Sequence, residues 1–112
     1  MIDVVTEEIK ESMAQFQYLQ QQLQSVLIQK ESLRLHAMEI EKALEELGKT
    51  SQKNAYKMTG AIMISKPVDE LKKELDESKE TMEIRIKSLE KIEEKTNSKL
   101  LELQEKLKSA IK

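Results

Sequence analysis

The sequence predicts a mainly α protein, an antiparallel two-helix coiled coil with a β-hairpin inserted between the helices. Three observations predict this fold. Charged residues occupy 36% of the 112 positions and aromatic residues only 3%, a composition that suits long helices better than a compact globular core. Apolar residues recur at alternating spacings of three and four residues in both halves of the chain. Between those halves, residues 55–66 follow a strand-like pattern instead.

The first helix is expected at residues 3–48, because its apolar pattern begins at Ile2 and runs to Leu47. Ser12 and Lys30 are the two polar exceptions, and they either set the register or make a contact across the helices; for Lys30 we favour a side chain that reaches out to the rim. The predicted seam positions are Ile2, Val5, Ile9, Ser12, Phe16, Leu19, Leu23, Val26, Lys30, Leu33, Ala37, Ile40, Leu44 and Leu47.

The second helix is expected at residues 67–111, with Pro67 at an early helical position. Its apolar spacing shifts after Met82, which predicts looser supercoiling in the middle of the helix and a weak point at Thr96. Because the two helices are of similar length, we expect both termini at one end and the hairpin at the other. The predicted seam positions are Val68, Leu71, Leu75, Ser78, Met82, Ile86, Leu89, Ile92, Thr96, Leu100, Leu103, Leu107 and Ile111.

The hairpin prediction rests on residues 55–66, in which a turn signal at Gly60 separates two β-prone runs. A two-stranded hairpin is marginally stable by itself and leaves both edges unpaired. We therefore expect it to pair with strands of other chains, so that the protein is an obligate oligomer. The residues predicted to carry this oligomerisation are Tyr56, Met58, Gly60, Ile62, Met63 and Ile64.

Composition and motifs exclude several classes of function. The net charge of -2 lacks the basic excess of proteins that bind nucleic acid or anionic membranes. No apolar run approaches the ~18 residues of a membrane span, and the acidic N-terminal stretch is unlike a signal peptide, so we expect a cytoplasmic protein. The chain has no Cys, a single His36 and no phosphate-binding loop. We therefore expect no catalytic residue, no metal site, no cofactor and no enzymatic activity.

Six of the ten residues 15–24 are glutamine, which indicates either a disordered low-complexity tract or the polar coat of a helix. Phe16, Leu19 and Leu23 fall on consecutive seam positions, and all six glutamines fall off the seam. The tract is therefore interpreted as a helix face, and a disordered, glutamine-rich adhesive is disfavoured.

The order of motifs along the whole chain resembles the beta-type subunits of prefoldin, most closely the archaeal form. The similar segments are the glutamine-rich stretch 15–24, the run 42–47 (KALEEL), Tyr56-Lys57 with Gly60 and the β run after it, and Glu70-Leu71. Pro67 departs from the pattern of that family at the junction of strand and second helix. The resemblance implies a hexamer with two alpha-type and four beta-type subunits, whose pooled hairpins form a β-barrel platform. It also implies ATP-independent capture of unfolded proteins at the coiled-coil tips and their transfer to a group II chaperonin.

An antiparallel arrangement would gather seam residues of both helices at the free tip, where they either bind apolar client segments or merely close the seam. Met13 lies off the seam near the same end and is an adaptable contact residue. The predicted client-binding residues are Ile2, Val5, Ile9, Met13, Leu103, Leu107 and Ile111.

A second apolar cluster lies off the seam of the first helix and comprises Leu27, Ile28, Leu35 and Met38. It indicates either packing between subunits or ordinary surface residues, and we favour the latter. The alternative to a chaperone subunit is a structural coiled-coil scaffold or spacer, which would not form a hexamer.

Overall fold

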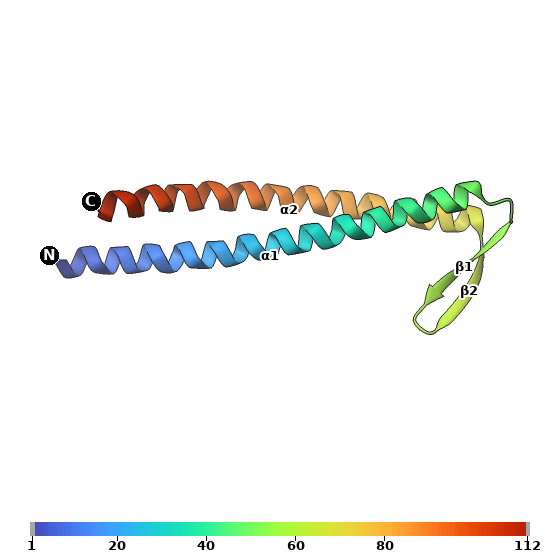
Figure 1. The fold of residues 1–112 in the computed structure, drawn as a ribbon, viewed down its shortest axis with the longest axis horizontal. Helices are drawn as coiled ribbons and strands as arrows, with labels where there is room; N and C mark the ends of the chain where they lie inside the picture. The colour runs from blue at the N-terminus through green and yellow to red at the C-terminus, as the bar shows by residue number, and fades with distance from the viewer. Residues whose placement is uncertain (1, 112) are drawn as a thin grey trace. The chain divides into compact units, whose positions relative to one another are not determined.

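The computed structural model describes residues 2–111, with side chains described for residues 7–110. The element order is α1 (Ile2–Lys49), β1 (Asn54–Thr59), β2 (Ile62–Pro67) and α2 (Val68–Ile111) (Figure 1). The two strands pair antiparallel with Asn54 opposite Pro67 and Thr59 opposite Ile62. The predicted fold class, two long helices with a β-hairpin inserted between them, is confirmed.

The chain divides into two compact units, and each helix contributes to both. The terminal unit comprises the residues up to Glu31 and those from Lys87 onward. The hairpin unit is Ser32–Ile86 and contains the β-hairpin with the adjoining ends of α1 and α2. Each unit has its own buried seam and is described separately.

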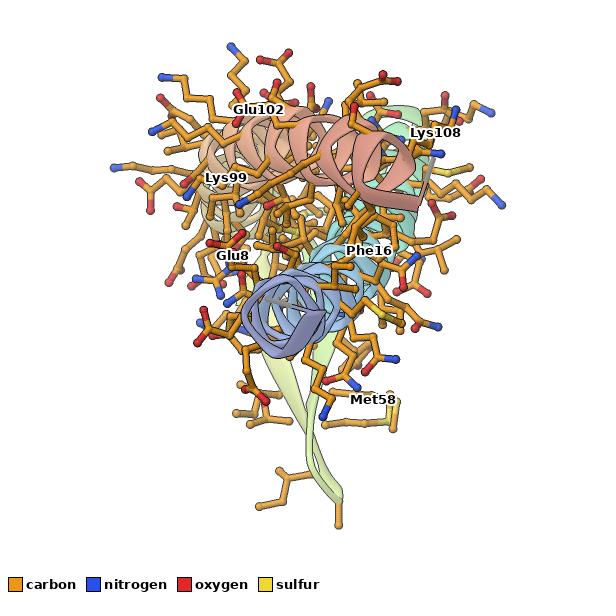
Figure 2. All side chains as sticks on the ribbon, turned by 90° about the vertical axis from the view of Figure 1, so that its left-hand side faces the viewer. Glu8, Phe16, Met58, Lys99, Glu102 and Lys108 are labelled. Atoms are coloured by element: carbon orange, nitrogen blue, oxygen red, sulfur yellow. The ribbon has the colours of Figure 1, made fainter. Side chains whose placement is uncertain are left out.

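In the terminal unit, the segments of α1 and α2 run antiparallel, because Lys30 pairs with Glu93 while Leu23, earlier in α1, shares a surface hollow with Leu100, later in α2. Phe16 lies between the two helices (Figure 2). The most buried side chains of this unit are those of Ser12, Leu19, Val26, Leu89 and Thr96. A seam between only two helices is narrow, so many of its other residues are half-buried rather than fully enclosed.

The seam of α1 agrees with the sequence pattern in both units. Every predicted position from Ile9 to Leu47 is buried or half-buried, and Ala43 is the one further residue of the described part of α1 that is not exposed. Ile40 forms the core of the hairpin unit together with Val68 and Leu71 of α2. The predicted seam positions Ile2 and Val5 have side chains outside the described ones.

The seam of α2 differs from the prediction at two positions. Ser78 and Ile92 are exposed, and the adjacent Lys79 and Glu93 are half-buried in their place. With Lys79 and Glu93 on the seam, the spacing alternates regularly between three and four residues from Lys79 onward within each unit, so the predicted drift after Met82 is wrong. The reason is that each of these charged side chains meets an opposite charge on α1, which an apolar pattern cannot reveal.

The hairpin turns at Gly60 and Ala61. Gly60 has φ +61° and is the only described residue with positive φ. A two-residue loop with positive φ only at its first position has the sign pattern of a type II′ turn, which favours Gly there because a side chain would strain the backbone. Ala61, expected in the second β run, belongs to this turn.

Three helix boundaries differ from expectation by one residue, the first being the start of α1 at Ile2. Pro67 ends β2 and α2 begins at Val68, whose N–H donates to the Lys53 carbonyl at 2.8 Å. Proline has no N–H to donate, so it fits the last position of an edge strand. At the end of α1, Gly48 lies inside the helix, and Thr50 N–H donates to the Glu46 carbonyl at 3.2 Å to close the last turn.

Candidate functional site

The β-hairpin presents apolar side chains on both of its faces. Tyr56, Met58 and Met63 share one face with Ser65, as the register pairs Tyr56 with Ser65 and Met58 with Met63. The side chains of Tyr56 and Met58 are 68% and 71% exposed. A surface this apolar and this exposed on an unpaired two-stranded sheet is typical of an interface with another chain.

The opposite face of the hairpin carries Ile62 and Ile64 together with Lys57 and Lys66. This face is attached to α2. Glu74 Oε1 accepts a hydrogen bond from Lys66 Nζ at 2.7 Å, and Glu74 Oε2 accepts one from Lys57 Nζ at 3.4 Å. One carboxylate therefore holds a lysine from each strand, and we call these three residues the Glu74 clasp.

The charges of the clasp favour each other's ionised forms. The hydrogen bond from Lys66 is the main cause that lowers the pKa of Glu74, with Lys57 adding to it, and desolvation opposes both. The same hydrogen bond raises the pKa of Lys66, with a further contribution from the charge of Glu70. Sequence reasoning missed the clasp because its lysines lie 17 and 8 residues from Glu74, and no local pattern relates them.

A surface hollow of about 440 Å³ lies beside the clasp in the hairpin unit. Its apolar lining comes from both helices and from the first strand, and Glu74 is among its polar lining residues. The apolar and aromatic residues that line it are Ala43, Leu47, Ala55, Tyr56, Leu71 and Leu75. The hollow therefore extends the apolar surface of the hairpin onto the helices at its base.

In the terminal unit, the predicted tip residues divide into two kinds. Ile9, Leu103 and Leu107 are half-buried on the seam, whereas Met13 is off the seam and 50% exposed. Ile2, Val5 and Ile111 have side chains outside the described ones. Partly open seam residues next to an exposed, flexible thioether form a surface that can adapt to varied apolar segments.

Charged side chains surround these tip residues. Glu7 and Lys10 form a weak exposed ion pair at 3.9 Å, and Glu8, Glu102 and Glu105 are also exposed. Figure 2 shows Glu8, Lys99 and Glu102 on one flank of the terminal unit and Lys108 on the other. Such a rim keeps a partly apolar end hydrated.

The off-seam cluster of α1 is exposed throughout, with Leu27 and Ile28 in the terminal unit and Leu35 and Met38 in the hairpin unit. Further exposed apolar residues that sequence reasoning did not single out are Tyr18, Ile84 and Leu101. Hydropathy alone does not separate them from seam residues, since exposure depends on where the partner helix lies.

His36, the single histidine, is exposed. Within the described residues, no three His, Cys, Asp or Glu side chains are grouped closely enough to hold a metal ion. No described helix is both long and apolar enough to span a bilayer.

Comparison with known proteins connects these surfaces to one family. Residues 10–112 match the family described as prefoldin subunit. The chain is 40% identical to prefoldin subunit beta of Archaeoglobus fulgidus over 105 residues, which cover 93% of this chain and 90% of the relative. It is 36% identical to prefoldin subunit beta of Thermococcus onnurineus, covering 94% of this chain and 91% of the relative.

A solved structure agrees with the sequence relationship. The crystal structure of the prefoldin beta subunit from Thermococcus strain KS-1 superposes with a TM-score of 0.82 at 36% identity, covering 92% of this chain and 91% of that one. The family match spans nearly the whole chain, and the relatives are covered almost completely. The chain therefore belongs to the prefoldin family, as a subunit of the beta type.

Proposed function

We propose that this subunit assembles through its hairpin with alpha-type subunits into a hexamer of two alpha and four beta chains, captures non-native proteins at the end of its terminal unit, and passes them to a group II chaperonin in the cytoplasm without ATP. Membership of the prefoldin family, which is a family of chaperones without enzymatic activity, makes the chain a chaperone subunit that works with other prefoldin subunits. The composition of the hexamer, the mode of capture and the transfer are the parts that we propose.

The exposed hairpin is the observation that carries the proposal. Its two strands leave both edges unpaired, and Tyr56, Met58, Ile62 and Met63 are all more than 60% exposed. Pairing with strands of neighbouring subunits would satisfy the edge N–H and C=O groups and bury these side chains together. A pooled β-barrel platform would pair the edge backbone groups, because a closed barrel has no edges, and would also bury the apolar side chains.

Capture at the terminal unit is supported by the mixture of exposed and half-buried apolar residues there. Met13 is accessible without any rearrangement, whereas Ile9, Leu103 and Leu107 become accessible when the end of the seam opens. Several such ends in one complex would bind an unfolded chain by avidity while each contact stays weak. Weak individual contacts allow release, as a handover to a chaperonin requires.

Assembly is tested by co-expression with an alpha-type prefoldin subunit and determination of the mass of the purified complex. The wild-type chain should give a mass of two alpha and four beta chains. Met58→Asp should prevent that complex, whereas Ile84→Asp, a matched change of an exposed apolar residue on α2, should preserve it. A chain that stays monomeric or dimeric with its partner present would indicate a coiled-coil scaffold instead.

Capture is tested by light scattering of an aggregating client in the presence of the assembled complex. Met13→Gln should reduce protection, and Met38→Gln serves as the matched control because Met38 is similarly exposed, at 55%, but lies in the hairpin unit. Capture at this end would be excluded by two results together. The Met13 variant would protect the client as well as the wild type does, and deletion of the first and last ten residues would leave protection complete.

A further inference from the structure

The first helix contains a long stretch without charge, in a chain that is otherwise densely charged. Residues 12–29 include no Asp, Glu, Lys or Arg, although these make up 36% of the sequence, and seven of them are glutamine. Solvated helix faces elsewhere in the chain alternate acidic and basic residues. Charged residues would keep this helix face soluble, as they do elsewhere in the chain. The glutamines are therefore expected to have a further role.

The glutamines of this stretch border a surface hollow of about 660 Å³ in the terminal unit. Gln17, Gln20, Gln21 and Gln24 supply its polar lining. Its apolar lining is supplied by Leu23 and Leu27 of α1 and Leu100 of α2. We call this site the glutamine hollow; its lining contains amides and hydrocarbon but no ionised group.

The dimensions of the glutamine hollow suit a short stretch of extended chain. Gln17 and Gln24 are seven residues apart, which corresponds to ~10 Å along a helix and to about three residues of an extended strand. A glutamine side chain offers both a carbonyl acceptor and two N–H donors. It can therefore bond to either the N–H or the C=O of a peptide group, whatever residue carries that group.

The absence of charge defines the kind of occupant. An ionised side chain placed against Leu23, Leu27 and Leu100 would lose hydration and find no opposite charge in the lining. On α2, the uncharged residues Asn97, Leu101 and Gln104 share one helix face at spacings of four and three residues, and Lys108 follows them on that face. The charged Lys99 and Glu102 lie on the flank shared with Glu8 (Figure 2).

We propose that the glutamine hollow is a second client-contact site, which binds an extended, uncharged segment of a non-native polypeptide through backbone hydrogen bonds to Gln20 and Gln24 and one apolar side chain against the leucines. The inference rests on the proposed chaperone function and adds a preference to it. The tip accepts apolar segments in general, whereas the glutamine hollow selects those without charge. A client that binds at both the tip and the glutamine hollow contacts one subunit at two sites.

The test uses the assembled complex and two fluorescent synthetic peptides of about ten residues, long enough to exceed the hollow. One contains only Gly, Ser, Asn and Leu, and the other is the same peptide with Asp at two of the Ser positions. Binding is followed by fluorescence anisotropy. The wild-type complex should bind the uncharged peptide several-fold more tightly than the acidic one.

Gln20→Glu with Gln24→Glu should weaken binding of the uncharged peptide about tenfold and of the acidic peptide by more, because ionised groups then require hydration inside the hollow. Gln20→Lys with Gln24→Lys should also weaken binding of the uncharged peptide, but it should strengthen binding of the acidic peptide. The matched control is Gln15→Glu with Gln22→Glu, which adds the same charge to the same helix; neither residue lines the hollow. The control should change both affinities less than twofold.

Three results would overturn the inference. Equal losses of affinity in the Gln20/Gln24 and Gln15/Gln22 variants would indicate a long-range effect of charge, and no loss in either would indicate that the hollow does not bind the peptide. A third is a change in sedimentation of the complex in the Gln20/Gln24 variants, which would make the hollow an interface between copies. Failure of the proposed function looks different, since the wild-type complex would then protect no client and bind neither peptide.

Discussion

Lys66 Nζ lies 2.7 Å from Glu74 Oε1, so the second strand of the hairpin is tied to α2 by a charged hydrogen bond. Lys57 on the first strand reaches the other oxygen of the same carboxylate. Tyr56 and Met58 lie on the opposite face of the strand pair from these two lysines. A clasp on one face therefore sets the direction in which the other face is presented to neighbouring subunits.

Removal of the clasp charge should impair assembly more than folding. Glu74→Gln keeps the size of the side chain but removes the carboxylate that accepts hydrogen bonds from both Lys57 and Lys66, so we expect several-fold weaker association with the alpha-type subunit, measured by titration and sedimentation. Glu77→Gln is the matched control, since Glu77 is exposed on the same helix and has no ion pair in the described structure. Glu74→Lys combined with Lys66→Glu should recover part of the lost affinity, and equal behaviour of the Glu74 and Glu77 variants would contradict the role of the clasp.

The clasp also predicts how the attachment of the hairpin to α2 depends on pH. The pKa of Glu74 is lowered from its ordinary value of 4.5, so its contribution is complete above that value and is lost as the pH falls through the lowered pKa. The pKa of Lys66 is raised from 10.5, so its contribution is complete below that value and is lost as the pH rises through the raised pKa. Hydrogen exchange of the strand amides should show constant protection between these limits and a loss in acid that is absent from the Glu74→Gln variant.

The ion pair of Lys30 with Glu93 crosses the seam of the terminal unit, where the two side chains are 12% and 25% exposed. Lys30→Glu would place two like charges in a partly buried position, and we expect it to lower the free energy of unfolding by about 2 kcal/mol. Adding Glu93→Lys should restore most of that loss, because the pair is then reversed rather than broken. Thermal unfolding followed by circular dichroism measures the stability of the single and the double variant. If the double variant is as unstable as Lys30→Glu alone, the ion pair contributes nothing to the stability of the seam.

Burial on the seam predicts which leucines hold the terminal unit together. Leu89 is 6% exposed, and Leu89→Ala should cost about 2–3 kcal/mol of stability, near the lower end for buried leucines because only one helix packs against it. Leu101→Ala, at a leucine that is 63% exposed, should change stability by less than about 0.5 kcal/mol. Urea unfolding of the full chain compares them, and similar losses in both variants would refute the observed phase of α2.

The two halves of the coiled coil show where an apolar pattern suffices and where it fails. In α1, the apolar residues are well spaced and outnumber the exceptions, so each predicted position that is described lies on the seam. In α2, Ile92 is the apolar choice by hydropathy, yet Glu93 takes the seam position because Lys30 faces it. The expectation that Lys30 reaches out to the rim is wrong for the same reason.

Thr96 shows a related limit. The sequence marks it as a polar interruption, but it is among the most buried residues and its Oγ1 donates to the Ile92 carbonyl at 2.7 Å. Because the hydroxyl is satisfied within its own helix, threonine fits a buried seam position at little cost. Sequence pattern identifies such a residue as polar but does not reveal that its hydrogen bond is already made.

By itself, the sequence determined the fold class, the seam of α1, the turn at Gly60 and the membership of a family, since all of these follow from local periodicity, backbone preference and the order of motifs. Only the tertiary structure decided the phase of α2, the Glu74 clasp and the glutamine hollow. The physical reason is that each of these depends on groups far apart in the chain: Lys30 meets Glu93, Glu74 holds a lysine from each strand, and Leu100 completes a site that begins at Gln17.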